Sequence, residues 1–574
     1  MVLSNLDWII IIAFFVISLL IGVYTLKFSS KDSANFFLSG RNMPWWVLGI
    51  SMVATTFAAD TPGLVAGIIR KDGISGNWVW WSFLLTGMLT VFFYSKLWRR
   101  TGIKTDLEFY ELRYSGKSAS FLRGFRALYL GVFFNVVIMA TVCLAAIKIG
   151  HVLFGFSATT SLLIACSVTG LYSMLGGLKG VLITDFIQFI IAMTGSIWAT
   201  IYVVNLPEIG GIENLITSVN VQDKLDLIPS FDSPDLFVPL LIVPLAVQWW
   251  SVWYPGAEPG GGGYIVQRML ASKSEKDATI ATLFFNVMHY AIRPWPWIIM
   301  GLASLIIYPN LIDLQQAFPE LDESFVKNDL SYAAMLKLLP TGLIGIVVTS
   351  LIAAFMSTIS THLNWGSSYV VNDFYVRFIN PKASSKLQVL VGRFSILIMM
   401  ILSALLAFVL EEAKDAFDLL LQIGAGTGLL FILRWFWYRI NPYSEITAMV
   451  VSFLMALVFF VNKKSDYNWF EIKQYEELVL GVIITSISWV LVSLLTKPSK
   501  TQTLERFNEI AFKNESKFKN FEYKIVSFLA SVLGVYALLF GIGLLIFSDF
   551  SSALISLIVF AICALLVFKF WKKI

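Results

Sequence analysis

Long apolar runs recur along the whole chain, and they limit its fold more than any other feature. The 574 residues are 57% hydrophobic and only 14% charged. A run of about 20 apolar residues crosses a bilayer as a helix, because backbone groups in lipid must be hydrogen-bonded within their own segment. The sequence therefore predicts an all-α polytopic membrane protein with about 15 transmembrane helices. We expect the spans near residues 7–26, 45–69, 77–97, 124–150, 158–175, 181–204, 237–270, 279–307, 340–375, 387–410, 416–438, 442–462, 474–496, 522–546 and 551–570.

Basic residues set the expected orientation of these spans. With the N-terminus outside, the segments on the inner side carry most of the lysines and arginines, as the positive-inside rule requires. We therefore expect the C-terminus in the cytoplasm and the protein in the plasma membrane, or in the inner membrane of a bacterium. The span at 7–26 has no basic leader or cleavage site, so we expect it to be retained. The outer loop 308–339 contains an amphipathic stretch at 330–338 that could cover an entrance as a lid.

Two of the expected spans carry helix-breaking sequences at mid-membrane depth. Residues 54–63 read ATTFAADTPG and residues 255–263 read PGAEPGGGG. Proline removes a backbone donor and glycine favours unwinding, so we expect neither span to be a continuous helix. Irregular backbone at this depth lines a cavity, and paired broken helices in the two halves of an inverted repeat mark the binding site of a secondary transporter. The two broken spans lie five spans apart, which predicts such a repeat.

A strip of hydroxyls interrupts the apolar run at 340–375. Ser357, Thr358, Ser360 and Thr361 are spaced so that pairs of them share one face of a helix. Hard cations such as Na⁺ prefer oxygen ligands of this kind. Serine and threonine in membrane helices also bond back to a carbonyl of their own helix, so the strip alone leaves both interpretations open.

Several motifs resemble those of the sodium:solute symporter family, the family of the sodium–glucose cotransporters. The resemblance rests on residues 36–46 (FFLSGRNMPWW), 176–188 (GGLKGVLITDFIQ), 264–268 (YIVQR) and 439–442 (RINP). It implies a five-plus-five inverted-repeat core at 45–438, with broken first and sixth core helices. It also implies one leading helix with a cytoplasmic linker at 1–44. The remaining segment, 439–574, would hold four trailing helices and a charged cytoplasmic loop at 497–521.

The same resemblance implies the ligands of a sodium site. Matched residue by residue, they are the carbonyls of Ala54, Phe57 and Ala354 and the hydroxyls of Ser357 and Thr358. Some members of the family bind a second Na⁺, for which Asp185, Ser360 and Thr361 stand at the matching positions. Asp185 could instead be a helix cap or part of a salt bridge in a gate. We therefore expect one or two coupled Na⁺ ions, and no organic cofactor.

The expected solute site departs from that of the sugar transporters. Trp80 stands where they have a sugar-binding glutamate, and Tyr290 stands where they have a lysine, whereas Gln422 matches a sugar-binding glutamine. Arg293 could pair with a buried carboxylate; if it has none within reach, an anionic solute is favoured. The residues expected to bind the solute are Asp60, Thr61, Trp80, Glu258, His289, Tyr290, Arg293 and Gln422.

These patterns favour a transporter and not an enzyme. We expect Na⁺-coupled symport of a small polar organic solute, either sugar-like or carboxylate-bearing, by alternating access. An ion or solute channel is the first alternative, but it would need a continuous polar path. A membrane-embedded sensor is the second. The expected partners are the solute, Na⁺ and the lipid bilayer, with no nucleic acid, and the sequence predicts no oligomeric state.

Overall fold

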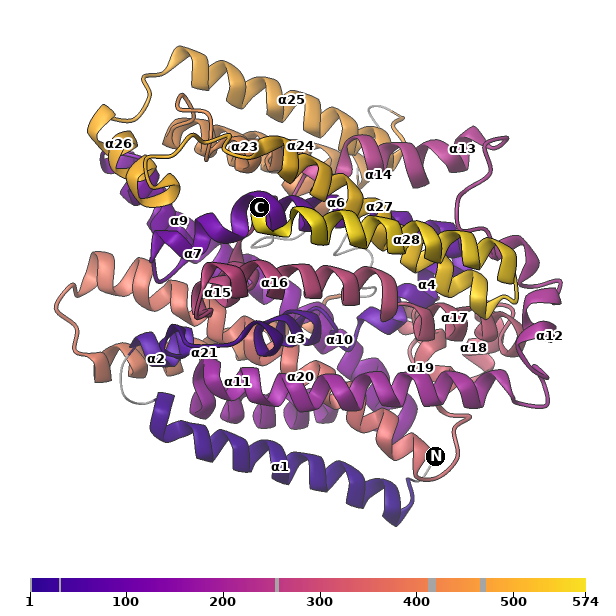
Figure 1. Cartoon of the computed structure of the whole chain (residues 1–574). Helices are drawn as coiled ribbons and strands as arrows, with labels where there is room; N and C mark the ends of the chain where they lie inside the picture. Colours follow the sequence, from indigo (N-terminus) through magenta and orange to yellow (C-terminus); the bar gives the residue numbers. More distant parts are fainter. Residues whose placement is uncertain (1–2, 30–32, 253–257, 411–419, 465–470) are drawn as a thin grey trace.

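The fold is a bundle of long helices that run side by side, with connecting loops at its two ends (Figure 1). The computed structural model describes residues 3–29, 33–252, 258–410, 420–464 and 471–574. Within these ranges every regular element is helical, and the one isolated β-bridge joins Met43 to Ser272. The expected all-α membrane architecture is therefore confirmed at the level of the fold class.

Eleven helices in the described ranges are long and apolar enough to cross a membrane. The other expected spans, at 45–69, 158–175, 237–270 and 416–438, are short, broken or partly outside the described residues. The long apolar helices cover Asn5–Thr25, Ile74–Thr101, Lys117–Phe154, Gly177–Val204, Glu275–Ile307, Leu343–Ile379, Ser385–Ala407, Pro442–Asn462, Gln474–Leu495, Phe521–Ile546 and Phe550–Lys573.

The helix α11 (Ala158–Val204) contains two of the expected spans joined by a reversal at Gly177, whose φ is 55°. The hydroxyls of Tyr172 and Thr184 are hydrogen-bonded to each other across this reversal. A straight helix would separate residues twelve positions apart by about 18 Å, so the two halves must fold back on each other. Only glycine adopts such a backbone conformation without strain.

The first broken span consists of α3 (Trp45–Thr55) and α4 (Thr61–Asp72). Pro62 lies in the first turn of α4, where its missing N–H costs nothing, and the chain between the two helices is irregular. In the second broken span, the first helical part ends at Trp250 and the second part is α15 (Gly263–Ala271). Gly260, Gly261 and Gly263 all have positive φ. Residues 253–257, which include Pro255 and Gly256 of the expected break, lie outside the described residues.

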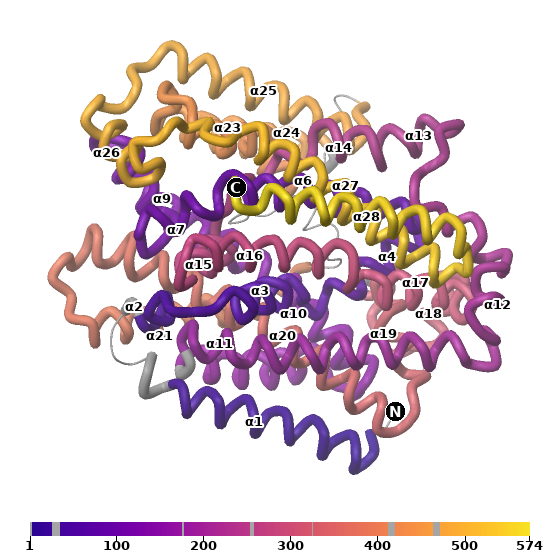
Figure 2. The backbone as a smooth tube through the Cα atoms, viewed as in Figure 1, coloured from indigo at the N-terminus to yellow at the C-terminus, as the bar shows by residue number. Residues whose placement is uncertain are grey.

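The central helix is α20 (Leu343–Tyr369), which carries the hydroxyl strip and is buried along almost its whole length. It packs against α1 (Asn5–Ser29), α3, α10 (Asn135–Phe154), α11 and α21 (Ser385–Ala407). Figure 2 shows α20 passing through the middle of this group. Because α20 contacts both α3 and α11, residues far apart in the sequence meet at its hydroxyls.

The C-terminal part adds two helix pairs around the bundle. These are α24 (Pro442–Lys464) with α25 (Gln474–Leu495), and α27 (Phe521–Ile546) with α28 (Phe550–Phe570). The polar segment between the pairs contains the short helix α26 (Thr501–Phe512), which buries Phe507, Ala511 and Phe512. The expected charged loop at 497–521 therefore includes a helix with one buried face.

Candidate functional site

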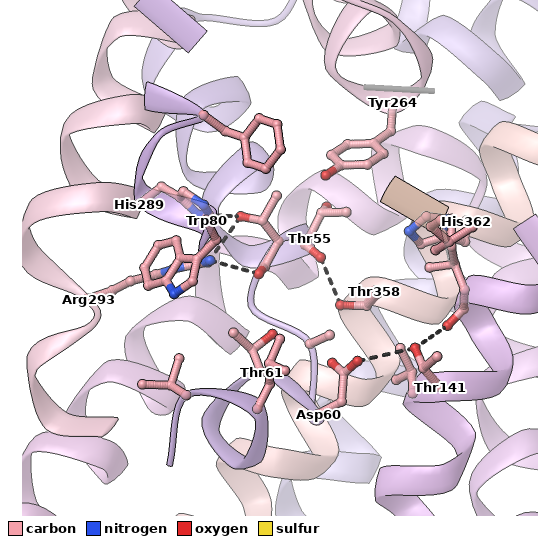
Figure 3. Close-up of a pocket in the computed structure, with 18 of the residues that line it drawn as sticks. Thr55, Asp60, Thr61, Trp80, Thr141, Tyr264, His289, Arg293, Thr358 and His362 are labelled. Carbon is pink, nitrogen blue, oxygen red and sulfur yellow. Dashed lines mark hydrogen bonds between the residues drawn. The ribbon is translucent and has the colours of Figure 1, made fainter. Parts of the chain in front are cut away.

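A cavity of about 150 Å³ lies at the break between α3 and α4. Pockets for drug-sized ligands usually measure roughly 300–1,000 Å³, so this cavity suits a small solute. Side chains from α3, α4, α10, α15, α20 and the π-helical turn η9 (Met288–Ile292) surround it (Figure 3). Its polar and aromatic lining comprises Thr55, Thr56, Asp60, Thr61, Trp80, Phe83, Thr141, Tyr264, His289, Tyr290, Arg293, Thr358 and His362.

The hydroxyl strip meets the broken helix at Thr358. Its hydroxyl donates a 2.8 Å hydrogen bond to the carbonyl of Thr55, the last residue of α3. The carbonyl of Ala54 accepts the N–H of Phe57 at 3.1 Å, whereas within the described residues no hydrogen bond reaches the carbonyl of Phe57. A buried carbonyl without a donor is a ready cation ligand, since such groups are otherwise paired. Ala354, the remaining expected carbonyl ligand, lies one turn before Thr358 on α20 and is 2% exposed.

Asp185 lies at the centre of a buried polar cluster beside this strip. One oxygen accepts the hydroxyl of Ser357 at 2.6 Å, and the other accepts the hydroxyl of Ser51. The guanidinium of Arg268 lies 3.9 Å from the second oxygen, and neither side chain of this ion pair is exposed. Asp185 therefore joins α11 to α3, α15 and α20.

The two hydroxyls expected at a second sodium site have other partners. Thr361 accepts a 2.8 Å hydrogen bond from Arg268, and its hydroxyl lies 3.1 Å from that of Thr55. Ser360 donates to the carbonyl of Ser357 in its own helix, at 3.1 Å. Asp185 thus contacts Ser357, a residue of the first expected site, and no direct hydrogen bond from it to Ser360 or Thr361 occurs in the described structure.

Arg293 forms one wall of the cavity and closes the C-terminal end of α3. Its guanidinium donates to the carbonyls of Val53 and Thr56 at 3.0 and 2.9 Å and to the Thr56 hydroxyl at 3.0 Å. It also lies 5.3 Å above the ring of Trp297. The residue is 1% exposed, its Nε has no hydrogen-bond partner, and no described carboxylate lies within 4.0 Å of it. Among the parts of the chain that the structure describes, this buried guanidinium thus contacts carbonyls and a hydroxyl but no anion.

Asp60 faces Arg293 from the opposite side of the cavity (Figure 3). It precedes the first residue of α4, where the partial positive charge of a helix N-terminus favours a carboxylate. Its Oδ2 accepts a 3.2 Å hydrogen bond from Thr141 of α10. The broken helix therefore has a cation at the end of α3 and an anion at the start of α4, each compensated in part by the helix dipole.

Aromatic rings complete the wall on the side of Arg293. The rings of Trp80 and Tyr290 stack with their centroids 6.0 Å apart, and His289 meets Tyr290 edge to face at 4.4 Å. Nδ1 of His289 lies 3.3 Å from the Thr56 hydroxyl. Such a surface can pack against the apolar face of a sugar ring.

Two residues expected to bind the solute do not line the cavity. Glu258 forms a buried ion pair with Arg126 at 2.5 Å, in a cluster that also includes Arg434 and Glu445. Gln422 donates to the carboxylate of Glu477 on α25, at 2.6 Å. Conversely, Thr141, Tyr264 and His362 line the cavity although the sequence did not mark them as solute ligands. A threonine inside an apolar helix, such as Thr141, is not distinguished in the sequence as a cavity residue. Tyr264 could have been found, because it belongs to the family-like motif at 264–268.

The helical fold and the cavity at the helix break define the class of protein. Interrupted helices around such a cavity are typical of secondary transporters. The sequence model of the sodium:solute symporter family matches residues 36–452, and the chain belongs to this family. It is therefore a membrane protein of the transporter class, as the resemblance implied.

Individual relatives agree with this assignment. Sodium/glucose cotransporter 1 of Oryctolagus cuniculus is 24% identical over 85% of this chain and 78% of its own length. The sodium/glucose cotransporter of Vibrio parahaemolyticus is 25% identical over 75% of this chain and 80% of its own. Sodium/myo-inositol cotransporter 2 of Oryctolagus cuniculus is 24% identical, covering 87% and 78%. Among solved structures, a Na⁺-coupled sialic acid symporter in an outward-open state has the same fold, with a TM-score of 0.66 and 22% identity over 87% of this chain and 99% of its own.

Proposed function

We propose that the protein couples the inward movement of Na⁺ to the uptake of a small polyhydroxylated carboxylate, such as a sugar acid. Family membership supports the coupling to Na⁺. The proposed ligands are the carbonyls of Ala54, Phe57 and Ala354 with the hydroxyls of Ser357 and Thr358. Their support is the contact between Thr358 and the end of α3, together with the unpaired Phe57 carbonyl beside it. The partial negative charge at the C-terminus of α3 also favours a cation there.

The contacts of Asp185 favour the transport of one Na⁺ per solute and not two. The guanidinium of Arg268 lies against both Asp185 and Thr361, two of the ligands that a second ion would need. Ser360, the third, bonds within its own helix. The positive charge beside Asp185 is therefore supplied by the protein, and Asp185 acts as a positioning residue that holds Ser357.

The buried positive charge of Arg293 is the main argument for an anionic solute. Within the described residues Arg293 has no carboxylate partner, and a buried cation left in this way is costly, so an anionic group on the solute would lower that cost. The guanidinium binds carboxylates well because its donors match the two carboxylate oxygens. The hydroxyl groups of the solute would face Asp60 and Thr141, and its ring would lie against Trp80 and Tyr290. The names of the relatives, which refer to glucose and myo-inositol, support a polyhydroxylated ring.

A matched pair of solutes tests this proposal. Galactose and galacturonate share a ring and differ by the carboxylate, so uptake of labelled forms of both into proteoliposomes isolates the effect of the charge. We expect Na⁺-dependent uptake of galacturonate, or inhibition by galacturonate of the uptake of the natural solute. Galactose should have little effect in either measurement. Preference for galactose over galacturonate would contradict the role given to Arg293.

A further inference from the structure

A second cavity lies at one end of the bundle, away from the transport site. Its volume is about 570 Å³, and its walls come from the end of the span Ile74–Thr101, the segments 432–436 and 512–525, and residues 572–574. Figure 2 shows the yellow end of α28 beside the purple segment around α7 (Ser95–Thr101), and Lys96 donates a hydrogen bond to the main-chain oxygen of Ile574.

The charged side chains in the walls of this cavity are almost all positive. Among the described residues that line it, Glu515 is the one acidic side chain. It pairs with Lys519, and Arg100 pairs with Glu275 of α16 (Glu275–Val287) just outside the cavity. The basic residues that line it are Lys96, Arg100, Lys517, Lys519, Lys524, Lys572 and Lys573.

Within the described ranges, most of these lysines have no carboxylate at ion-pair distance. Lys517 bonds the carbonyl of Phe436 at 3.3 Å, and Lys573 bonds the hydroxyl of Tyr523 at 3.1 Å. Among the described residues, Lys524 and Lys572 have neither an ion pair nor a side-chain hydrogen bond. Burial, together with the charge of Arg113, lowers the pKa of Lys517. Clustered ammonium groups repel one another, so a bound anion would stabilise this end of the protein.

The position and the other walls of the cavity indicate the kind of anion. The spans Ile74–Thr101 and Phe550–Lys573 end here and the span Phe521–Ile546 begins here, which places the cavity at the depth of lipid headgroups. Its apolar wall includes Phe92, Phe93, Phe436, Phe512, Phe518 and Phe521. Phe518 and Phe521 are 60% and 43% exposed, as is common for aromatic residues at a membrane interface.

We propose that this cavity is a binding site for a phosphate-bearing anion, held by Lys524 and Lys572 together with the neighbouring lysines. The lysines would bind the phosphate, and the phenylalanines would contact an acyl chain or glycerol backbone. A basic pocket between membrane helices with an apolar wall is suited to an anionic phospholipid headgroup. A soluble phosphate compound shares the same chemistry, so the experiment must separate the two sources.

The test uses the purified full-length chain with two probes. The first is phosphatidylglycerol in phosphatidylcholine nanodiscs, with phosphatidylcholine alone as the reference, and the second is pyrophosphate added to protein in a neutral detergent. Retained lipid is counted by native mass spectrometry, and pyrophosphate binding is followed by the thermal unfolding midpoint. We expect phosphatidylglycerol to bind selectively; a response to pyrophosphate would support the site and identify its ligand as a soluble phosphate.

Matched variants decide whether the binding belongs to this cavity. The double variant Lys524→Gln/Lys572→Gln should weaken binding at least about tenfold, since each lysine near an anionic surface contributes substantially to attraction. Lys382→Gln/Lys386→Gln removes the same charge from two exposed positions, one in the turn before α21 and one in its first turn, and should leave binding unchanged. Lys524→Arg should also bind, which separates loss of charge from loss of folding. Absence of binding to both probes, or equal weakening in the two double variants, would overturn the proposal.

Discussion

The hydroxyl of Thr358 in the middle of α20 donates a 2.8 Å hydrogen bond to the carbonyl of Thr55, where α3 ends. The two residues are 303 positions apart in the sequence. The contact joins the hydroxyl strip to the unwound segment of the broken helix, which is where the proposed Na⁺ ligands converge. In an alternating-access transporter, a cation bound here would hold the two helices together.

The first prediction concerns the hydroxyl ligands. Thr358→Ala and Ser357→Ala should each raise the Na⁺ concentration for half-maximal uptake about tenfold, because losing one ligand worth roughly 1.4 kcal/mol changes affinity by that factor. Ser367→Ala is the matched control, since this buried serine on the same helix donates its hydroxyl to the carbonyl of Asn364, one turn earlier. Unchanged Na⁺ dependence in the two site variants would exclude these hydroxyls as ligands.

The second prediction concerns Arg293. A charged hydrogen bond contributes roughly 1.5–3 kcal/mol, so Arg293→Gln should raise the KM for an anionic solute about 10- to 150-fold. Arg293→Lys should retain part of the affinity, since it keeps the charge but loses the two-pronged geometry. Arg506→Gln on the exposed face of α26 removes the same charge far from the cavity. Transport of the anionic solute by Arg293→Gln with the wild-type KM would contradict this role of Arg293.

The third prediction concerns the number of ions. One Na⁺ moving with a monovalent anion carries no net charge, so a tenfold Na⁺ gradient should sustain about a tenfold solute gradient, whatever the membrane potential. Uptake should therefore be the same with and without a potassium diffusion potential across the vesicle membrane. Stimulation by an inside-negative potential would show that a second Na⁺ is carried.

The variant Asp185→Asn complements this measurement. It should leave the coupling ratio at one but lower the thermal midpoint, because it leaves the buried guanidinium of Arg268 without its carboxylate. A changed coupling ratio in Asp185→Asn would place Asp185 among the ion ligands and restore the expected second site with Ser360 and Thr361.

The fourth prediction is a pH dependence at the end of the bundle. Burial raises the pKa of Glu111 on α8 (Phe109–Arg113), but hydrogen bonds from Arg377, Ser120 and Arg123 outweigh this and lower it from 4.5 to about 2. A lowered pKa stabilises the folded state above the unfolded value, and this stability is lost as pH falls through the folded value. Wild type should therefore melt a few degrees above Glu111→Gln near neutral pH, and the difference should disappear between pH 4.5 and about 2. A constant difference across that range, or an equal loss in Glu208→Gln on an exposed loop, would contradict this.

The apolar runs, the two helix breaks and the family were predictable from the sequence. Long apolar runs predict helices because backbone groups in lipid must be hydrogen-bonded within their own segment. Pro62 and the segment Gly260–Gly263 break helices through their own backbone properties, so these breaks are visible in the sequence. The cavity residues Asp60, Arg293 and Trp80 could be named because intramembrane charges and aromatic residues are marked in the sequence. The five-plus-five repeat and the orientation stay predictions.

Other contacts depend on packing that the sequence does not encode locally. The partner of Glu258 is Arg126, 132 residues away, and Gln422 turns toward Glu477 on a trailing helix. Both were expected in the cavity, because a charged or amide group in a membrane span indicates a polar environment. The sequence does not indicate which residue is its partner. Arg268 was part of a recognised motif, but its position between Asp185 and Thr361 follows only from how α15 lies against α20.

The dependence of solute uptake on a Na⁺ gradient tests the central claim most directly. Purified protein in sealed vesicles would be supplied with labelled solute under an inward Na⁺ gradient, and in parallel with potassium or choline replacing Na⁺. We predict accumulation above the external concentration with the Na⁺ gradient, and only slow equilibration without it. Equal uptake in the three buffers would contradict Na⁺-coupled symport.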